Sequence, residues 1–223
     1  MNEQSAVPRR GEEVVLSFGD SLLRQSDVEL LRCCGWLNDR LIGFYFEYLE
    51  RIGFKDYAAK VCFVTPDVTQ FVKLHEGDDA ELRIFLEPLA LHTKDLVLLA
   101  VNDNQSNTHA GGAHWTLLTY WRPGNLFECY DSAGSVVPAP ARLCSVKLTR
   151  FLGAATSPTF EVVDCPKQEN SYDCGVYVLM FAERVCGVKL QGKTASLLSS
   201  ITADCVTRLR IDTLALIQSL CVT

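Results

Sequence analysis

The sequence contains no apolar run that approaches the ~20 residues needed to cross a bilayer. Its longest apolar runs cover residues 96–101 and 176–182. Residues 1–19 also lack the long apolar stretch of a secretory signal peptide. We therefore expect a soluble protein of the cytoplasm or the nucleus, without a membrane partner.

Clusters of basic residues are missing as well. The chain has 21 Lys and Arg against 27 Asp and Glu, a formal net charge of −6. Because nucleic-acid binding needs a concentrated basic surface, this balance argues against nucleic acid as a partner. The sequence also lacks the phosphate-binding motifs G-x-x-x-x-G-K-[ST] and G-x-G-x-x-G and the serine hydrolase motif G-x-S-x-G.

Metal and redox motifs are absent although ten cysteines and four histidines are present. Neither C-x-x-C nor H-E-x-x-H occurs, so we expect no metal site, no thioredoxin-like site and no cofactor. A chain of 223 residues can build its core without disulfides, and in a reducing compartment its cysteines should be thiols.

Hydrophobic periodicity predicts a strand-rich middle with helices before and after it. The expected strands cover residues 14–18, 61–64, 96–101, 114–121, 126–130 and 160–163. A short helical turn is expected at 26–29 and a helix capped by Asn38 follows it. Further helices are expected at 66–74, 79–85, 145–152, 174–186 and 201–220. Turn residues at 122–125 predict a hairpin. Since no linker or repeat divides the chain, we expect one monomeric α+β domain over 14–223 after a flexible segment 1–13, without alternating βαβ units.

Cys174 differs from the other cysteines in its neighbourhood. It follows the polar segment 168–173 and precedes a continuously apolar one, so we expect it at the N-terminus of a buried helix. There the helix dipole favours the thiolate, which is the nucleophilic form. By itself, Cys174 could equally be a small residue at a helix start.

His114 and Asp131 supply possible partners for this thiol. His114 begins one strand of the expected hairpin and Asp131 ends the other, so antiparallel pairing brings them together. A carboxylate beside an imidazole is the orienting half of a catalytic triad. Taken singly, His114 could be a structural histidine and Asp131 a turn residue; with Cys174 they predict a papain-type nucleophile. The polar, glycine-ended stretch 102–112 before His114 is expected to be a mobile loop beside this site.

Three blocks of sequence resemble the Ulp/sentrin-specific cysteine protease family: G-A-H-W at 112–115, Y-D-S at 130–132 and Q-x-N-S-Y-D-C-G at 168–175. The similarity covers roughly residues 14–187 and is greatest to the short deneddylase branch. The resemblance implies a papain-like fold of the Ulp type, with a central mostly antiparallel sheet, flanking helices and a buried helix that carries the nucleophile. It also implies cleavage after the C-terminal diglycine of a ubiquitin-like modifier, foremost the neddylation modifier, in precursor processing and in removal from conjugates.

The same resemblance assigns catalytic roles. Cys174 would attack the carbonyl, His114 would transfer the proton and Asp131 would hold the imidazole. Gln168 matches the family's oxyanion donor, although a glutamine at this place could also be an exposed loop residue.

Three further residues match the family's substrate-binding positions. Trp115 would cover the diglycine, whose lack of side chains suits a narrow aromatic channel. Trp36 and Asp39 would hold the modifier's extended tail. The alternatives are that Trp36 belongs to the core and that Asp39 serves only the first turn of its helix. Residues 134–144 and the tail after 187 match no motif of the family.

Two other functions stay open. The first is cleavage of SUMO or ubiquitin by the same triad. The second is a non-catalytic module that binds a ubiquitin-like protein through the same channel.

Overall fold

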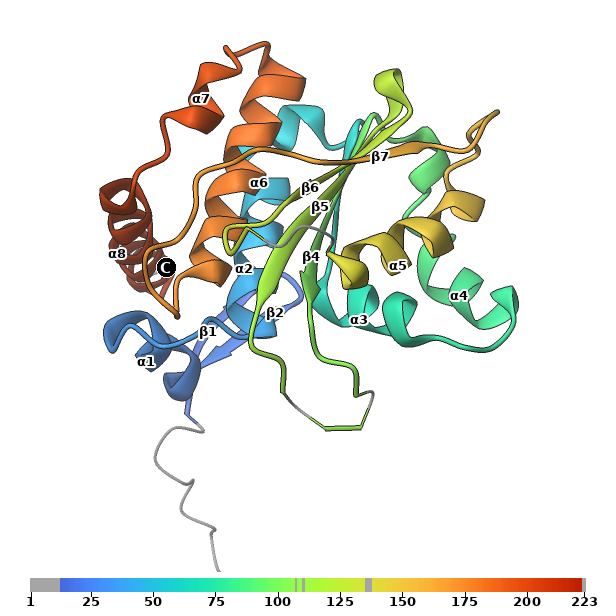
Figure 1. The fold of residues 1–223 in the computed structure, drawn as a ribbon. Coiled ribbons are helices and arrows are strands. Elements are labelled where there is room, and N and C mark those ends of the chain that lie inside the picture. The colour runs from blue at the N-terminus through green and yellow to red at the C-terminus, as the bar shows by residue number, and fades with distance from the viewer. Residues whose placement is uncertain (1–12, 107, 110, 135–137, 222–223) are drawn as a thin grey trace, which may run out of the picture.

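In a computed structural model of the chain, the described residues are 13–106, 108–109, 111–134 and 138–221 (Figure 1). The strands are β1 (Val14–Phe18), β2 (Ser21–Arg24), β3 (Val61–Val64), β4 (Leu96–Asn102), β5 (Trp115–Trp121), β6 (Leu126–Tyr130) and β7 (Thr159–Val162). The α-helices are α1 (Gln25–Arg32), α2 (Asp39–Tyr48), α3 (Pro66–Leu74), α4 (Asp79–Leu86), α5 (Ala139–Leu148), α6 (Cys174–Gln191), α7 (Ser196–Ser199) and α8 (Ala203–Leu220).

The central sheet has the strand order β3-β4-β5-β6-β7, and β1 pairs with β2 in a separate ribbon. β4 with β5 and β5 with β6 are antiparallel, whereas β3 with β4 and β6 with β7 are parallel. The predicted α+β class with flanking helices is confirmed, but the sheet is mixed rather than mostly antiparallel. Parallel neighbours need a crossover, which α3 and α4 supply between β3 and β4 and α5 supplies between β6 and β7. These two crossover units were not predicted from the sequence, which indicated a fold without alternating βαβ units.

Helices cover both faces of the sheet (Figure 1). Alternate residues of β4 point to opposite faces: Leu96, Leu98 and Ala100 join a core with α2, α6 and α8. Val97 and Leu99 join a second core with α3, α4 and α5. Because β4 is buried on both faces, it reads in the sequence as an unbroken apolar run.

Several helix boundaries differ from the sequence prediction, including the end of α6, which extends to Gln191 rather than to residue 186. α5 begins at Ala139, not at residue 145, because Pro140 fits the first turn of a helix and does not interrupt one. α1 begins one residue earlier than Ser26, and Asp27 accepts the backbone N–H of Arg24 at 2.8 Å. Asn38 caps α2 as predicted, accepting the N–H of Leu41 at 3.1 Å.

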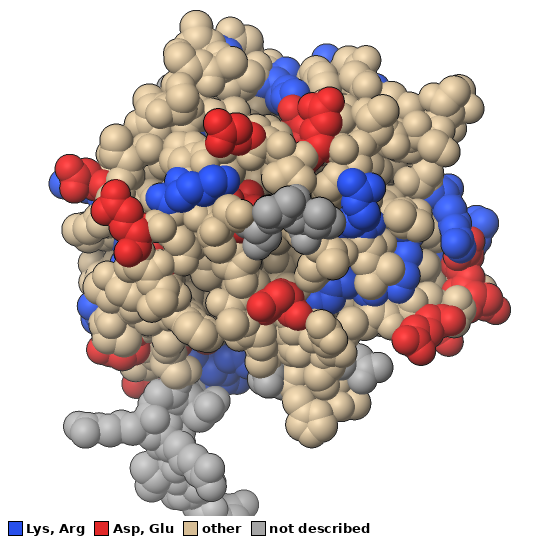
Figure 2. Space-filling model, in the orientation of Figure 1, with Lys and Arg blue, Asp and Glu red and all other residues tan. Residues whose placement is uncertain are grey.

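The surface carries charges of both signs. On the face drawn in Figure 2, Lys and Arg lie among Asp and Glu. Within the described part of the chain, no helix is both long and apolar enough to span a bilayer, and no three His, Cys, Asp or Glu side chains gather as a metal site. The segment expected to be flexible, 1–13, lies outside the described residues except for residue 13.

Candidate active site

A groove of about 520 Å³ lies between the segment before α2 and the loop that joins β4 to β5. Five of the seven predicted site residues line it: Trp36, Asp39, His114, Trp115 and Cys174. The groove thus brings together side chains from three distant parts of the sequence. The other two predicted residues, Asp131 and Gln168, are not among the residues that line it.

His114 and Asp131 lie side by side, as the hairpin predicts. The register pairs Leu117 with Tyr130, and His114 Nε2 is 2.7 Å from Asp131 Oδ1. The Asp131 side chain is 1% exposed and that of His114 is 21% exposed, so the carboxylate acts on the groove through the imidazole. The pKa of His114 is raised to about 9; the hydrogen bond to Asp131 is the largest cause, and a hydrogen bond with Cys174 is the second largest. Because a carboxylate only accepts, Nε2 carries the proton between them, which leaves Nδ1 for the thiol.

Hydrogen bonds and a glycine determine the backbone conformation just before His114. Asp103 Oδ1 accepts the N–H groups of Ala113 at 2.7 Å and of His114 at 3.1 Å. Gly112 has a φ of +89°, and a Cβ there would come 1.9 Å from Asn102 Oδ1. Glycine is therefore required at this position, both for the left-handed backbone and for the close approach.

Cys174 is the first residue of α6, as predicted, and is 2% exposed. Asp173 occupies the N-cap, yet its side chain makes no capping bond to the helix. The N–H groups of the first turn, that of Cys174 included, therefore receive no cap from this carboxylate. Such N–H groups are suited to stabilise a negative charge that develops beside them.

The buried cysteines of the core are in environments that disfavour a thiolate. Burial raises the pKa of Cys62, Cys129 and Cys144 to about 12 and also raises the pKa of Cys165 and Cys186. The thiol of the groove differs from these in facing an imidazole. All ten cysteines are free thiols.

Gln168 lies on the loop that approaches the end of β6. Its Oε1 accepts the hydroxyl of Ser132 at 2.7 Å, and its Nε2 donates to the carbonyl of Asn170 at 2.7 Å. The amide nitrogen has two N–H donors, so one is left after the bond to Asn170. Gln168 is half-buried and held at both ends, so it is not the exposed loop residue of the alternative interpretation.

Trp115 links the two walls of the groove. Its indole N–H donates to the carbonyl of Leu37 at 2.9 Å. Leu37 also packs against α6, where a Cβ on Gly175 would come 2.8 Å from Leu37 Cβ. Trp36 is 47% exposed, which excludes the alternative that it is a core residue. The role of Leu37 could not be predicted from the sequence, because its acceptor is a backbone carbonyl, which every residue type has.

Asp39 is exposed in the first turn of α2 and lies in the groove beside Asp67. Burial, and then the carboxyl of Asp39, raise the pKa of Asp67. This end of the groove therefore has an acidic character. Asp39 favours the helix start and also lines the groove, so both roles raised by the sequence stay open.

The loop before β5 is tied to α3 by a buried cation. Lys73 is 2% exposed, and its Nζ donates to the carbonyls of Asn102 and, at 2.6 Å, Asn104. Gln70 Nε2 donates to the carbonyls of Asn104 at 3.1 Å and Ser106 at 3.2 Å. Burial lowers the pKa of Lys73. Within the loop that was expected to be mobile, residues 102, 104 and 106 are thus bonded to side chains of α3, while residues 107 and 110 lie outside the described part.

A buried thiol at a helix start, an imidazole beside it and a carboxylate behind the imidazole form the geometry of a papain-like cysteine protease. Residues 35–222 match the Ulp1 protease family, C-terminal catalytic domain. The chain belongs to this family of cysteine peptidases.

Similar proteins agree with this assignment. The chain is 45% identical to sentrin-specific protease 8 of Homo sapiens, over 94% of this chain and 98% of the relative. It is 32% identical to NEDD8-specific protease 1 of Arabidopsis thaliana, over 94% of both chains. The Ulp1 protease domain solved in complex with Smt3, the yeast ortholog of SUMO, has the same fold, with a TM-score of 0.75 at 19% identity over 96% of this chain and 91% of that one.

Proposed function

We propose that this protein cleaves after the C-terminal diglycine of NEDD8, both in the precursor and in conjugates. The observation that carries the catalytic part is the His114–Asp131 pair beside Cys174 in one groove. The choice of modifier is supported by the NEDD8-specific relative and by the resemblance to the deneddylase branch.

In the proposed reaction, the Cys174 thiolate attacks the carbonyl carbon of the second glycine. As the C–N bond breaks, His114 gives its proton to the leaving amine, and a thioester remains. Water then adds to the thioester while His114 takes its proton, and the C–S bond breaks to return the thiolate. Asp131 holds the imidazole throughout, and the N–H of Cys174 with the amide of Gln168 stabilises the oxyanion.

The groove suits an extended tail that ends in glycines. Where the groove runs past Trp115 and Leu37, a side chain of the tail would meet aromatic and aliphatic atoms, whereas glycine has no side chain to do so. Trp36 and Asp39 lie farther along the same groove, where they can contact the residues that precede the diglycine.

The experiment that tests this function compares C-terminal fluorogenic derivatives of NEDD8, SUMO and ubiquitin. We expect the highest kcat/KM for NEDD8. A higher value for SUMO or ubiquitin would replace the proposed substrate, and no hydrolysis of any of the three would overturn the proposed activity.

A non-catalytic binding module is distinguished by the reactivity of Cys174. Time-resolved iodoacetamide labelling with peptide mapping at neutral pH is expected to modify Cys174 far faster than the buried thiols of the core. Cys33, Cys34 and Cys221 are exposed and serve as internal references. Labelling of Cys174 no faster than these references would favour the binding module.

A further inference from the structure

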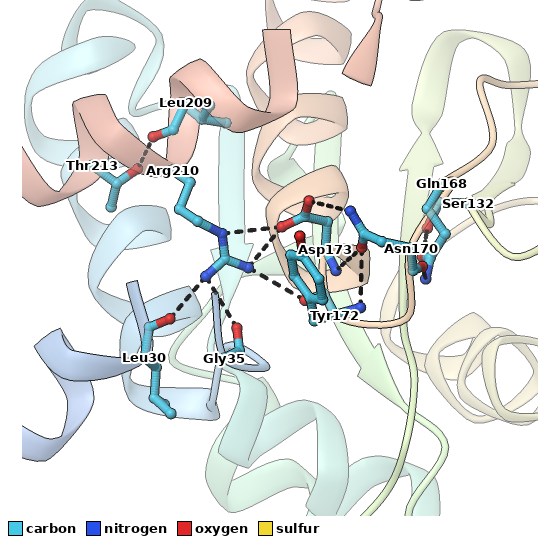
Figure 3. Close-up of polar contacts among 10 residues, drawn as sticks. All are labelled: Leu30, Gly35, Ser132, Gln168, Asn170, Tyr172, Asp173, Leu209, Arg210 and Thr213. Carbon is cyan, nitrogen blue, oxygen red and sulfur yellow. Dashed lines mark hydrogen bonds and ion pairs between the residues drawn. The ribbon is translucent and has the colours of Figure 1, made fainter. Parts of the chain in front are cut away.

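Arg210 lies on α8, outside every block of sequence that carries the resemblance, and it is 4% exposed. Its guanidinium faces the loop that precedes Cys174 (Figure 3). A buried guanidinium needs a partner for each of its N–H groups, since unpaired ones carry a large desolvation cost. The partners of Arg210 therefore show what this residue holds.

All five N–H donors of Arg210 are used. Nε and Nη2 donate to Asp173 Oδ1 at 3.0 Å and 2.7 Å, and Nη2 also donates to the carbonyl of Tyr172 at 3.3 Å. Nη1 donates to the carbonyls of Leu30 at 2.9 Å and Gly35 at 3.0 Å. One side chain thus joins the end of α1, the residue before Trp36 and the loop before the nucleophile.

These attachment points bear directly on the groove. Gly35 precedes the wall formed by Trp36 and Leu37, and Asp173 precedes Cys174. The distance between the wall and the sulfur therefore depends on the guanidinium that ties both segments to α8. The indole N–H of Trp115 holds the same wall from the other side, at the Leu37 carbonyl.

Arg210 also determines what the Asp173 carboxylate does. An aspartate at an N-cap ordinarily accepts N–H groups of the first helical turn. Here Oδ1 receives Arg210 and Oδ2 receives Asn170 Nδ2 at 2.7 Å, and no capping bond is made. Without the guanidinium, Asn170 alone among these side chains would hold the carboxylate away from the N–H groups beside Cys174.

We propose that Arg210 is a positioning residue of the reaction, which sets the groove wall against Cys174 and keeps the Asp173 carboxylate away from the start of α6. It touches neither the substrate nor the reacting atoms. This inference rests on the proposed function, because it concerns how the tail carbonyl is aligned with the sulfur.

A purely stabilising role would predict different behaviour. Replacing both members of a buried ion pair by uncharged groups is often neutral for stability, while removing one member is strongly destabilising. The double variant Arg210→Met/Asp173→Asn therefore separates stability from positioning. It removes the buried charges together, and it also removes the ties to Leu30 and Gly35.

The test measures hydrolysis of the NEDD8 derivative by Arg210→Lys and by the double variant. Lysine keeps the charge but cannot make five hydrogen bonds to these four acceptor atoms in a planar array. We expect kcat to fall by about tenfold or more with a smaller change in KM, because misalignment of the reacting groups costs rate more than binding. The double variant should regain thermal stability relative to Arg210→Met, yet keep the low kcat.

Two further measurements complete the test. Hydrogen exchange of peptides covering 33–38 and 168–176 should be faster in Arg210→Lys than in the wild type. Arg208→Lys is the matched control, because Arg208 lies on the same helix, 75% exposed, and pairs only with Asp212 among the ion pairs of the described residues. It should leave kcat and exchange unchanged.

The outcomes are distinct. A folded Arg210→Lys variant with wild-type kcat, or a double variant that regains stability and kcat together, would overturn the positioning role. If the wild type hydrolyses none of the modifier derivatives, the proposed function fails first, and the positioning role fails with it. Faster exchange in Arg210→Lys would then still show that the guanidinium fixes both segments.

Discussion

Trp115 and Leu37 are joined by a hydrogen bond from the indole N–H to the backbone carbonyl, at 2.9 Å and across 78 residues of sequence. The bond connects the residue after His114 with the segment that forms the opposite wall of the groove. The bond therefore ties the residue next to the proposed catalytic imidazole to the wall that faces it.

Trp115→Phe should weaken the groove without unfolding the protein. An aromatic ring stays, but the hydrogen bond and part of the indole's contact area are lost; the hydrogen bond alone is expected to lower the free energy of unfolding by about 0.5–1.5 kcal/mol. We expect kcat/KM for the NEDD8 derivative to fall by about tenfold, because the wall loses its tie. Trp121→Phe is the matched control at the other end of β5, and an equal loss of activity there would contradict the interpretation.

Cys174→Ala should abolish hydrolysis. Loss of the nucleophile is expected to lower kcat by at least ~10³-fold, while the change of a small buried side chain leaves the fold intact. Circular dichroism checks the fold and the fluorogenic assay checks the rate. Cys221→Ser, at an exposed position on the far end of α8, should retain full activity. Residual turnover by Cys174→Ala above one tenth of wild type would assign the nucleophile elsewhere.

Asp131→Asn should move the alkaline limb of the pH–activity profile. Asp131 is the largest cause of the raised pKa of His114, which is about 9 against an ordinary value of 6.5. The imidazolium gives a proton to the leaving amine, so activity should fall as the pH rises through about 9 in the wild type. In Asp131→Asn the imidazolium loses its carboxylate, and the limb should move to lower pH.

The same variant should also reduce the maximum of the profile. Because the carboxylate orients the imidazole, we expect kcat to fall by roughly 10²–10⁴-fold. Glu161→Gln, which removes an exposed carboxylate of β7, provides the comparison and should leave the profile unchanged. An alkaline limb that stays near pH 9 in Asp131→Asn would show that another group titrates there.

Gln168→Ala should lower kcat more than it raises KM. Removal of an oxyanion donor typically costs about 10²–10³-fold in kcat. Ser132→Ala removes the hydroxyl that donates to Gln168 Oε1, so it should give a smaller loss of the same kind. If both variants raised KM and left kcat intact, Gln168 would be a substrate-binding residue and the oxyanion role would be wrong.

The neighbourhood of the site could be predicted from the sequence because short-range rules govern it. Alternating strands around a Pro-Gly-Asn turn require a hairpin, and the hairpin places His114 beside Asp131. A polar segment followed by an apolar one requires a helix start at Cys174. The resemblance to the protease family then supplied Gln168, Trp36 and Trp115.

The parallel strand pairs could not be predicted in the same way. Whether β3 and β7 run parallel to their neighbours depends on whether the intervening helices return the chain to the same end of the sheet, and that is decided by packing of the whole chain. The start of α5 was missed for a local reason, since two prolines favour a loop unless the second one falls in the first helical turn.

The sequence by itself determined the chemistry of this protein: a thiol, an imidazole and a carboxylate at fixed places in strands and a helix, where local periodicity governs position. Only the tertiary structure decided how these parts are held. The Leu37 carbonyl, the buried Lys73 under the loop and the five bonds of Arg210 involve backbone atoms and residues far apart in the chain. Such contacts leave no local pattern, because any residue can offer a carbonyl and only the fold determines which one a side chain meets.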